Sequence, residues 1–159
     1  MQKHRQRHLG RELALRWLFE IEATRQPPDA VMAAVPEDVE ELETLEEEGR
    51  EFARQLVRGV LEARKQIDDI IVKFARAWAL DRMAAIERNV LRIALYEILH
   101  LPDIPASVSV DEAVEITKHY ASDESGKFVN GILGAYLRSE EGQAAQQDDA
   151  PPPAPRSPR

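Results

Sequence analysis

The 159-residue chain carries a net charge of −8, contains no cysteine and is 43% hydrophobic. This length and composition fit one globular domain with its own core. The lack of cysteine excludes a disulfide scaffold, a cysteine zinc site and a cysteine nucleophile, and it suits the reducing cytoplasm, where we expect the protein. No apolar run approaches the roughly 20 residues of a membrane span, so we expect no membrane partner.

The charges are distributed unevenly along the chain. Residues 1–16 hold five Arg or Lys residues against the single acid Glu12, whereas residues 36–51 hold nine acids and one arginine. A net negative charge alone disfavours a nucleic-acid partner, but a local basic segment can still bind nucleic acid. The acidic run is interpreted as the solvated flank of a helix, with an acidic binding surface as the alternative.

Apolar residues recur at helical spacing along most of the chain. The stripes fall within residues 9–21, 52–74, 83–94, 110–116 and 128–136. Segments with prolines at 25–29 and 101–105 interrupt the pattern, because proline ends helices. No strand-length alternation bounded by turn signals occurs. The sequence therefore predicts an all-α bundle of about five to seven helices.

Two helix starts and a tail are also predicted. Ser109 and Glu112 have the spacing of a capping box, which predicts that a helix begins at "SVDE". Ser122 or Asp123 is the expected N-cap of the next helix. From residue 142 the chain lacks apolar residues beyond alanine and becomes rich in proline. Residues 142–159 are therefore predicted to be a disordered tail that follows a helical domain at 1–141.

The dipeptide Gly126-Lys127 also occurs near the end of the phosphate-binding P-loop motif, but the rest of that motif is missing here. The motif needs a glycine where Ala121 stands and a serine or threonine where Phe128 stands. The pair His4 and His8 has no third metal ligand tied to it by a motif. No nucleophile elbow and no zinc-protease motif occurs. The sequence therefore predicts a protein that is not an enzyme and that uses no cofactor or metal.

The basic N-terminus is one candidate nucleic-acid surface. On a helix, a basic arc of His4, Arg7, His8 and Arg11 lies opposite an apolar arc of Leu9, Leu13 and Trp17. This layout predicts a helix that docks by one side and points its basic side outward. Arginine suits RNA phosphates because its guanidinium group offers planar, bidentate donors.

The turn after Ser122 is a second candidate surface. It places Ser125, Gly126 and Lys127 at a helix N-terminus, where free amides and the helix dipole attract phosphate. Farther along, Gly131 and Gly134 each cost about 1 kcal/mol relative to alanine inside a helix. That cost suggests a close approach by a neighbouring helix, or alternatively by a nucleic-acid backbone or a partner protein.

Three residues are candidate partner contacts. Glu97 falls within the apolar arc of its helix, where an unpaired carboxylate is costly. It is interpreted as part of a structural ion pair or a helix-capping contact, and alternatively as a contact with a partner. Leu15 and Phe19 lie away from Leu9 and Leu13, so they meet either another helix or another subunit.

Three segments together resemble the NusB family of transcription antitermination factors. They are "GRELALRWLFEIE" at 10–22, "IERNVLRIALYEILH" at 86–100 and "IPASVSVDEAVEITKHYASDESGKFVNGIL" at 104–133. The last is the most specific, because it joins "EAVEI-K-Y" to "KFVNG-L" in that order. The resemblance covers about residues 3–138. It implies an all-α fold of two packed three-helix bundles.

The resemblance also implies partners and a binding surface. It implies binding to single-stranded RNA of the boxA type together with NusE, a small-subunit ribosomal protein, in the RNA polymerase complex that transcribes ribosomal RNA. The candidate RNA-binding residues, from the resemblance and from the two basic surfaces, are His4, Arg5, Arg7, Arg11, Arg88, Ser125, Lys127, Phe128 and Asn130. Glu124, beside Lys127, is expected to repel RNA. Phe19 stands where the family commonly has tyrosine, and Trp17 where a small residue is usual.

Three alternatives stay open. NusB-like domains also begin ribosomal RNA cytosine methyltransferases, but that enzyme needs a following Rossmann domain, which we expect only if the chain is a fragment. A purely protein-binding helical module would carry the basic N-terminus incidentally. A homodimer would cover Leu15 and Phe19 with a second copy of the chain.

Overall fold

The computed structural model describes residues 2–76 and 78–149, and all regular elements of these residues are helices, which confirms the all-α prediction. The α-helices are α1 (Gln2–Thr24), α2 (Pro28–Val31), α3 (Glu47–Glu62), α4 (Arg64–Ala75), α5 (Ala85–His100), α6 (Ala106–Tyr120), α7 (Asp123–Arg138) and α8 (Glu140–Asp149). Two short 3₁₀ helices, η1 (Glu40–Leu42) and η2 (Leu80–Arg82), lie in the connections. None of the helices in these residues combines the length and the apolar character that a bilayer crossing requires.

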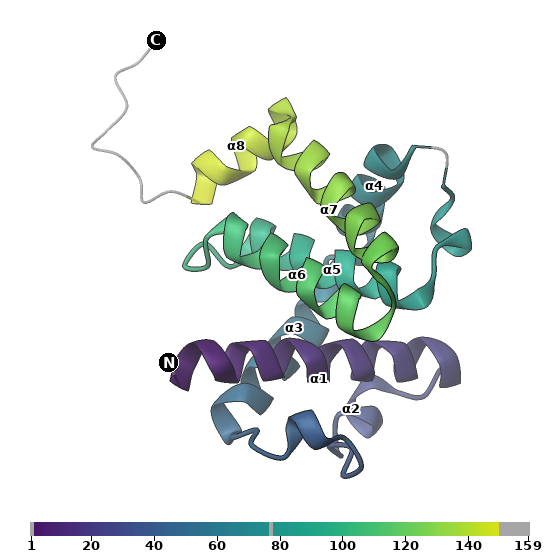
Figure 1. Ribbon diagram of the computed structural model, residues 1–159, viewed down its shortest axis with the longest axis vertical. Coiled ribbons are helices and arrows are strands. Elements are labelled where there is room, and N and C mark those ends of the chain that lie inside the picture. Colours follow the sequence, from purple (N-terminus) through teal and green to yellow (C-terminus); the bar gives the residue numbers. More distant parts are fainter. Residues whose placement is uncertain (1, 77, 150–159) are drawn as a thin grey trace.

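The helices form two groups (Figure 1). In the first group, α1 packs along α3 and contacts the short α2. In the second, α5, α6 and α7 contact one another, α4 packs on α5 and α7, and α8 packs on the same two helices. Helix α5 joins the groups, since it contacts both α1 and α3. The second group is thus larger than the three-helix bundle that the resemblance implies.

The crossing of α1 and α3 depends on two glycines. A Cβ atom added to Gly10 would lie 2.7 Å from the carbonyl oxygen of Gly49. Such a distance is too short for any side chain, so the absence of Cβ atoms lets the two backbones approach. The stripe predicted for α1 is buried against this crossing, with Leu9, Leu13 and Trp17 each no more than 2% exposed. The tight crossing fixes the direction in which the basic residues of α1 point.

Both predicted proline breaks are confirmed, and three boundaries differ from prediction. The stripe from 52 to 74 is divided between α3 and α4 at Ala63, although neither proline nor glycine occupies that position. Helix α6 begins at Ala106 after Pro105, so Ser109 is not its N-cap. Residues 142–149 belong to helix α8, so disorder from residue 142 is wrong for them. The remainder of the predicted tail, 150–159, lies outside the described residues.

Candidate nucleic-acid interface

The first turns of α1 carry the exposed cations of the candidate interface. Lys3, His4 and Arg5 are all exposed. The guanidinium group of Arg5 donates a hydrogen bond of 2.8 Å to the hydroxyl of Thr44, in the segment before α3. This bond holds Arg5 at the surface and leaves its other donors available. The placement of His4 and Arg5 fits their predicted role.

The next two basic residues of α1 are bound to acids, mainly from the second helix group. Arg7 donates to Asp103 in the α5–α6 connection at 2.7 Å, and its side chain is 25% exposed. His8 lies between two carboxylates, with Nδ1 2.8 Å from Glu112 and Nε2 3.6 Å from Glu12. The hydrogen bond with Glu112 raises the pKa of His8, and partial burial opposes the rise. Both residues are half-buried, so any RNA contact by them would compete with these bonds.

Arg11 is buried, which contradicts its predicted place on an outward basic arc. Its side chain is 2% exposed, and it donates to Glu97 from Nε at 2.7 Å and from a terminal nitrogen at 2.8 Å. A third donor reaches Glu112 at 3.1 Å, and the hydroxyl of Ser109 donates to Glu97 at 2.7 Å. Arg11 therefore stabilises the packing of α1 on α5 and α6 and is not an RNA contact.

The same cluster settles the position of Glu97. Its side chain is 1% exposed and fully engaged by Arg11 and Ser109, so the partner-binding hypothesis for Glu97 is wrong and the structural ion pair is confirmed. Glu112, the other acid of the cluster, is also buried. Burial raises the pKa of Glu112, but its hydrogen bond with His8 and the charges of His8 and Arg11 outweigh this and lower it.

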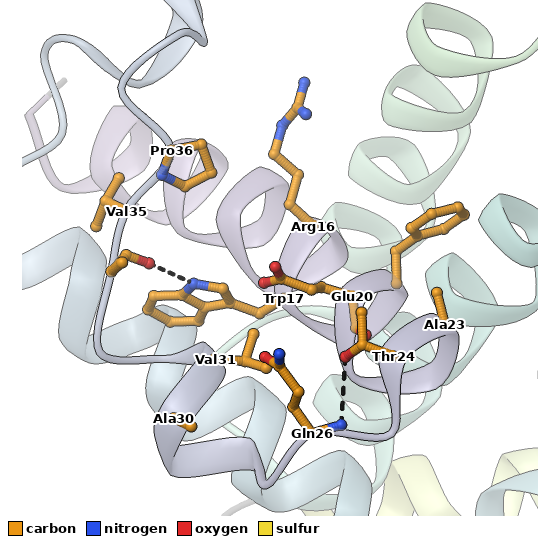
Figure 2. Close-up of a pocket in the computed structure, with 12 residues that line it drawn as sticks. Arg16, Trp17, Glu20, Ala23, Thr24, Gln26, Ala30, Val31, Val35 and Pro36 are labelled. Atoms are coloured by element: carbon orange, nitrogen blue, oxygen red, sulfur yellow. Dashed lines mark hydrogen bonds between the residues drawn. The ribbon is translucent and has the colours of Figure 1, made fainter.

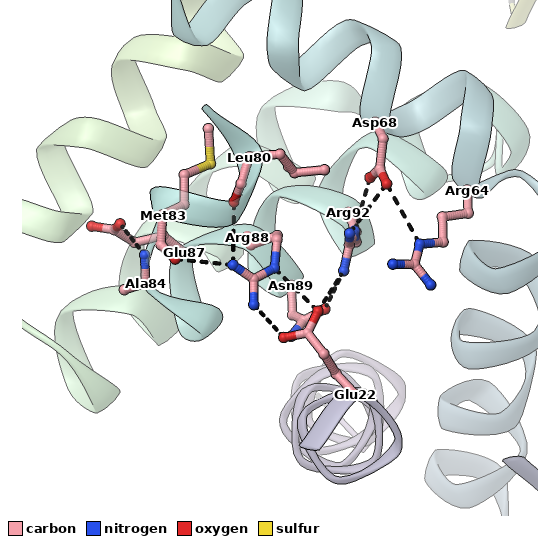
Figure 3. A network of polar contacts seen from close by, with 10 residues as sticks. All are labelled: Glu22, Arg64, Asp68, Leu80, Met83, Ala84, Glu87, Arg88, Asn89 and Arg92. Carbon is pink, nitrogen blue, oxygen red and sulfur yellow. Dashed lines mark hydrogen bonds and ion pairs between the residues drawn. The ribbon is translucent and has the colours of Figure 1, made fainter. Parts of the chain in front are cut away.

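Arg88 is also occupied inside the protein, which contradicts its predicted extension toward RNA. Its guanidinium group pairs with both carboxylate oxygens of Glu22 and donates to the carbonyl oxygens of Leu80 at 3.2 Å and Met83 at 2.9 Å. Arg92 continues the network by donating to Glu22 and Asp68 (Figure 3). The network ties the C-terminal half of α1 to α4 and α5.

A cleft beside the start of α1 contains a lysine and a histidine that sequence reasoning missed. The hollow of about 460 Å³ is lined by Arg5 and His8 from α1, by Glu41 from η1, and by Lys118 and His119 from α6. His119 lies 3.0 Å from Glu41, and Lys118 is exposed. The sequence gives little indication of their role. The segment "TKHY" shows only two polar residues at the end of a helix, and it does not show that Arg5, His8 and Glu41 line the other side of the cleft.

Lys118 links this cleft to the start of α7. Its aliphatic stem lies over Gly126, since a Cβ atom added to that glycine would come 2.7 Å from the Cγ of Lys118. Gly126 immediately precedes the exposed Lys127. A path of cationic side chains therefore runs from Arg5 through the cleft to Lys127, which joins two segments more than 100 residues apart.

The first turn of α7 is capped by the protein itself. Ser122 is the N-cap, as predicted, and its hydroxyl accepts a hydrogen bond of 3.0 Å from the amide of Ser125. The amide of Gly126 donates to the carbonyl oxygen of Ser122. Two of the amides expected to meet phosphate are thus already used, and Asp123 and Glu124 add negative charge to the turn. The side chain of Lys127 is the stronger candidate for a phosphate contact.

The remaining candidates on α7 lie on or beside its exposed face. Asn130 is exposed, and Phe128 is half-buried with its ring 6.3 Å from the ring of Trp78. Nothing lies within 4 Å of a Cβ atom added to Gly131, and an atom added to Gly134 would meet only the flexible side chain of Arg138. No described helix therefore accounts for these two glycines, which leaves the alternative of an external partner.

A separate apolar surface lies on the outer side of α1. Phe19 is 47% exposed, whereas Leu15 is buried at 4%. Both line a hollow of about 230 Å³ with Ile86 and Tyr120, and Phe19 also borders a hollow of about 540 Å³ between α1 and α2. In the larger one, the indole of Trp17 donates to the carbonyl oxygen of Ala34 (Figure 2). Leu15 thus meets other helices, and only Phe19 offers an exposed partner contact.

Among the described residues, no group of three or more histidine, aspartate or glutamate side chains has an arrangement that could hold a metal ion. The histidine pair of α1 is divided in the structure, since His4 is exposed and His8 is bound to acids.

Comparisons with known proteins give one consistent result. The sequence model described as the NusB family matches residues 8–138. The transcription antitermination protein NusB of Symbiobacterium thermophilum is 46% identical over 148 residues, which are 91% of this chain and 96% of the relative. The NusB structure of T. maritima superposes with a TM-score of 0.76 at 35% identity and covers 89% of this chain and 96% of that one.

A second solved structure contains binding partners. A crystal structure of the antitermination factors NusB and NusE in complex with dsRNA superposes with a TM-score of 0.72 at 29% identity. The match covers 88% of this chain and 98% of the chain compared.

Proposed function

The chain belongs to the NusB family, and we propose from this premise that it is a transcription antitermination factor that binds boxA-type RNA together with NusE. In this function it acts on RNA polymerase during transcription of ribosomal RNA, in the cytoplasm, and works by binding and not by catalysis. The observation that carries the proposal is the cationic path from Arg5 through Lys118 to Lys127, because it joins the two predicted basic segments into one surface.

The proposed RNA surface comprises His4, Arg5, Lys118, His119, Ser125, Lys127, Phe128 and Asn130, with Arg7 and His8 at its inner edge. Exposed lysine and arginine would contact phosphates, whereas Phe128 and Asn130 are suited to a splayed base. The related complex contains dsRNA. We favour a single strand here, because aromatic and amide side chains reach base edges and faces that a duplex hides.

The charge of the surface explains why a second protein would be required. The acids Glu41 and Glu115 line the cleft together with its cations. The acidic residues at 37–51 lie beside the first turns of α1, since the side chain of Gln6 bonds to Thr44 and Glu46. Nearby carboxylates weaken attraction for phosphate, so we expect RNA affinity to be modest without NusE. Phe19, between the two hollows on α1, is the proposed contact for NusE.

Matched charge variants test the RNA surface. Lys127→Gln and Lys118→Gln should each weaken RNA binding and reduce the slope of log affinity against log salt by about 0.7. Glu124→Gln should tighten binding at fixed salt, because it removes a negative charge beside Lys127. The measurement is fluorescence anisotropy with a labelled boxA-like RNA in the presence of NusE.

The control is Lys65→Gln, since Lys65 is an exposed lysine of α4 whose partner is Asp69, outside the proposed surface. The variant should leave both affinity and salt slope unchanged. Equal losses for Lys65→Gln and Lys127→Gln would show that the protein attracts RNA only through its overall charge. An unchanged or weaker affinity for Glu124→Gln would place RNA elsewhere.

A homodimer through Phe19 is the second candidate for the apolar surface. The observation that favours it is the exposure of a large aromatic side chain beside a hollow of about 540 Å³. Sedimentation of the protein with and without NusE distinguishes the two partners. A dimer that NusE dissociates would show that both use this surface.

A further inference from the structure

Trp78 is an exposed aromatic residue that neither the basic path nor the protein core explains. Its exposed fraction is 53%, the highest among the large hydrophobic residues in the described part of the chain. It lies between α4 and η2, outside all regular helices. No described residue accepts a hydrogen bond from its indole nitrogen. A single exposed apolar side chain is common on protein surfaces, so a role for Trp78 has to be argued from the residues around it.

The only ring near Trp78 among the described aromatic residues is that of Phe128. Their centroids are 6.3 Å apart with an interplanar angle of 82°, an edge-to-face contact. This arrangement uses an edge of one ring and a face of the other, and it leaves Trp78 53% exposed. Phe128 is half-buried and directly follows Lys127, which is exposed. The pair therefore forms an aromatic corner at one end of the cationic path.

We propose that Trp78 and Phe128 form a platform on which one base of the bound single-stranded RNA stacks. The inference rests on the proposed function and adds Trp78 as a recognition residue. Stacking on an aromatic ring needs no particular base, since every base has a π face. Lys127 is placed to neutralise the phosphate of the stacked nucleotide. The same corner would be a poor site for duplex RNA, whose bases are already stacked on each other.

The charges around the corner favour a nucleic-acid occupant over a purely apolar one. The segments that carry the two rings also carry exposed cations, with Lys127 next to Phe128 on α7 and with Arg76 and Arg82 close to Trp78 in the sequence. Asp81 and Glu124 are the nearest acids in the sequence of the same segments. An apolar protein surface would leave the three cations desolvated without partners, whereas a nucleotide supplies both a π face and a negative charge.

The test measures the affinity of a labelled single-stranded boxA-like RNA for Trp78 variants in the presence of NusE. Trp78→Ala should weaken binding roughly five- to hundredfold, which is the range for losing one base–aromatic stack. The salt slope should not change, because no phosphate contact is lost. Trp78→Phe keeps a ring and should retain most of the affinity. Val72→Ala is the control, since Val72 is another exposed apolar residue, at 51%, on α4.

A spectroscopic readout supports the same test without depending on the stability of an alanine variant. The chain has two tryptophans, and the other one, Trp17, is 2% exposed. RNA should therefore quench emission of the wild-type protein, and the quenching should be absent in Trp78→Phe. Wild-type affinity in Trp78→Ala, or RNA binding by the wild-type protein that leaves the emission of Trp78 unquenched, would overturn the inference, while Lys127 variants still test the proposed function. Absence of any RNA binding by the wild type would overturn both.

Discussion

Arg11 and Glu97 form the centre of a buried ionic cluster that joins α1, α5 and α6. Both side chains are at most 2% exposed, and every bond they make is to a residue of another helix. Breaking such a pair by removing one partner typically costs about 3–5 kcal/mol, because the other charge is left buried and uncompensated. The cluster therefore explains an arginine in the middle of α1 without any RNA.

The sequence shows which helix positions are polar, but it does not show what faces them. Arg7, His8 and Arg11 share the polar arc of α1. The sequence correctly separates this arc from the apolar side of the helix, where Leu9 and Leu13 are buried. The acids that face the polar arc come from residues 97–112, which lie 86–104 positions away in the chain. Arg88 follows the same rule, since its partner Glu22 lies on α1. Outward basic residues and buried ion pairs therefore have the same sequence pattern.

His8 gives this cluster a predicted pH dependence. Its hydrogen bond with Glu112 raises its pKa above the ordinary value of 6.5. A histidine whose pKa is higher in the folded state contributes stability below its unfolded pKa and loses it as the pH rises through its folded pKa. Thermal stability of the wild-type protein should therefore fall as the pH increases above about 6.5. The His8→Gln variant should not show this part of the fall, because it lacks the titrating side chain.

At acidic pH, the predicted loss of stability comes from a carboxyl group whose pKa is lowered. The pKa of Glu112 is lowered from its ordinary value of 4.5, so its contribution is present above that pH and is lost as the pH falls through its folded pKa. Melting curves of wild type and His8→Gln across both ranges check the prediction. Parallel profiles above pH 6.5 would contradict it.

At the scale of the helices, periodicity predicted where most elements lie because each buries one continuous stripe. The proline breaks at 25–29 and 101–105 were equally clear, since proline acts locally. The division at Ala63 was not, because α3 and α4 continue one apolar pattern and turn only through their packing against other helices. Helix α8 was missed because its alanine and glutamine residues resemble those of a disordered tail, although it packs on α5 and α7.

Gly131 provides a test of what lies against the exposed face of α7. Nothing within 4 Å would obstruct a Cβ atom at this position, so Gly131→Ala should stabilise the isolated protein by about 0.5–1 kcal/mol. Chemical denaturation measures the change. If RNA or NusE approaches the backbone here, the same variant should also weaken that partner's binding.

Gly59 is the matched control for this substitution. A Cβ atom added to Gly59 would lie 2.0 Å from the ring of Tyr96, so Gly59→Ala should destabilise the fold. A stability loss for Gly131→Ala similar to that of Gly59→Ala would show that α7 is packed at Gly131 after all.

At the scale of the whole molecule, packing places the basic start of α1 against the acidic segment before α3 and against α6. The charge is therefore less polarised than the sequence suggests. The candidate site was predicted in two separate pieces, His4 with Arg5 and Ser125 with Lys127. Packing connects them through Lys118 and His119, whose role depends on the opposite wall of the cleft. A surface with this mixed charge is suited to RNA binding shared with a second protein.

The most direct test is fluorescence anisotropy with a short boxA-like RNA at two salt concentrations, with the protein alone and with NusE added. A scrambled RNA and a duplex form of the same sequence serve as comparisons. We predict salt-sensitive binding that NusE tightens and that favours the single-stranded boxA-like sequence over both comparisons. Absence of binding even with NusE, or equal affinity for the scrambled RNA, would contradict the proposed antitermination function.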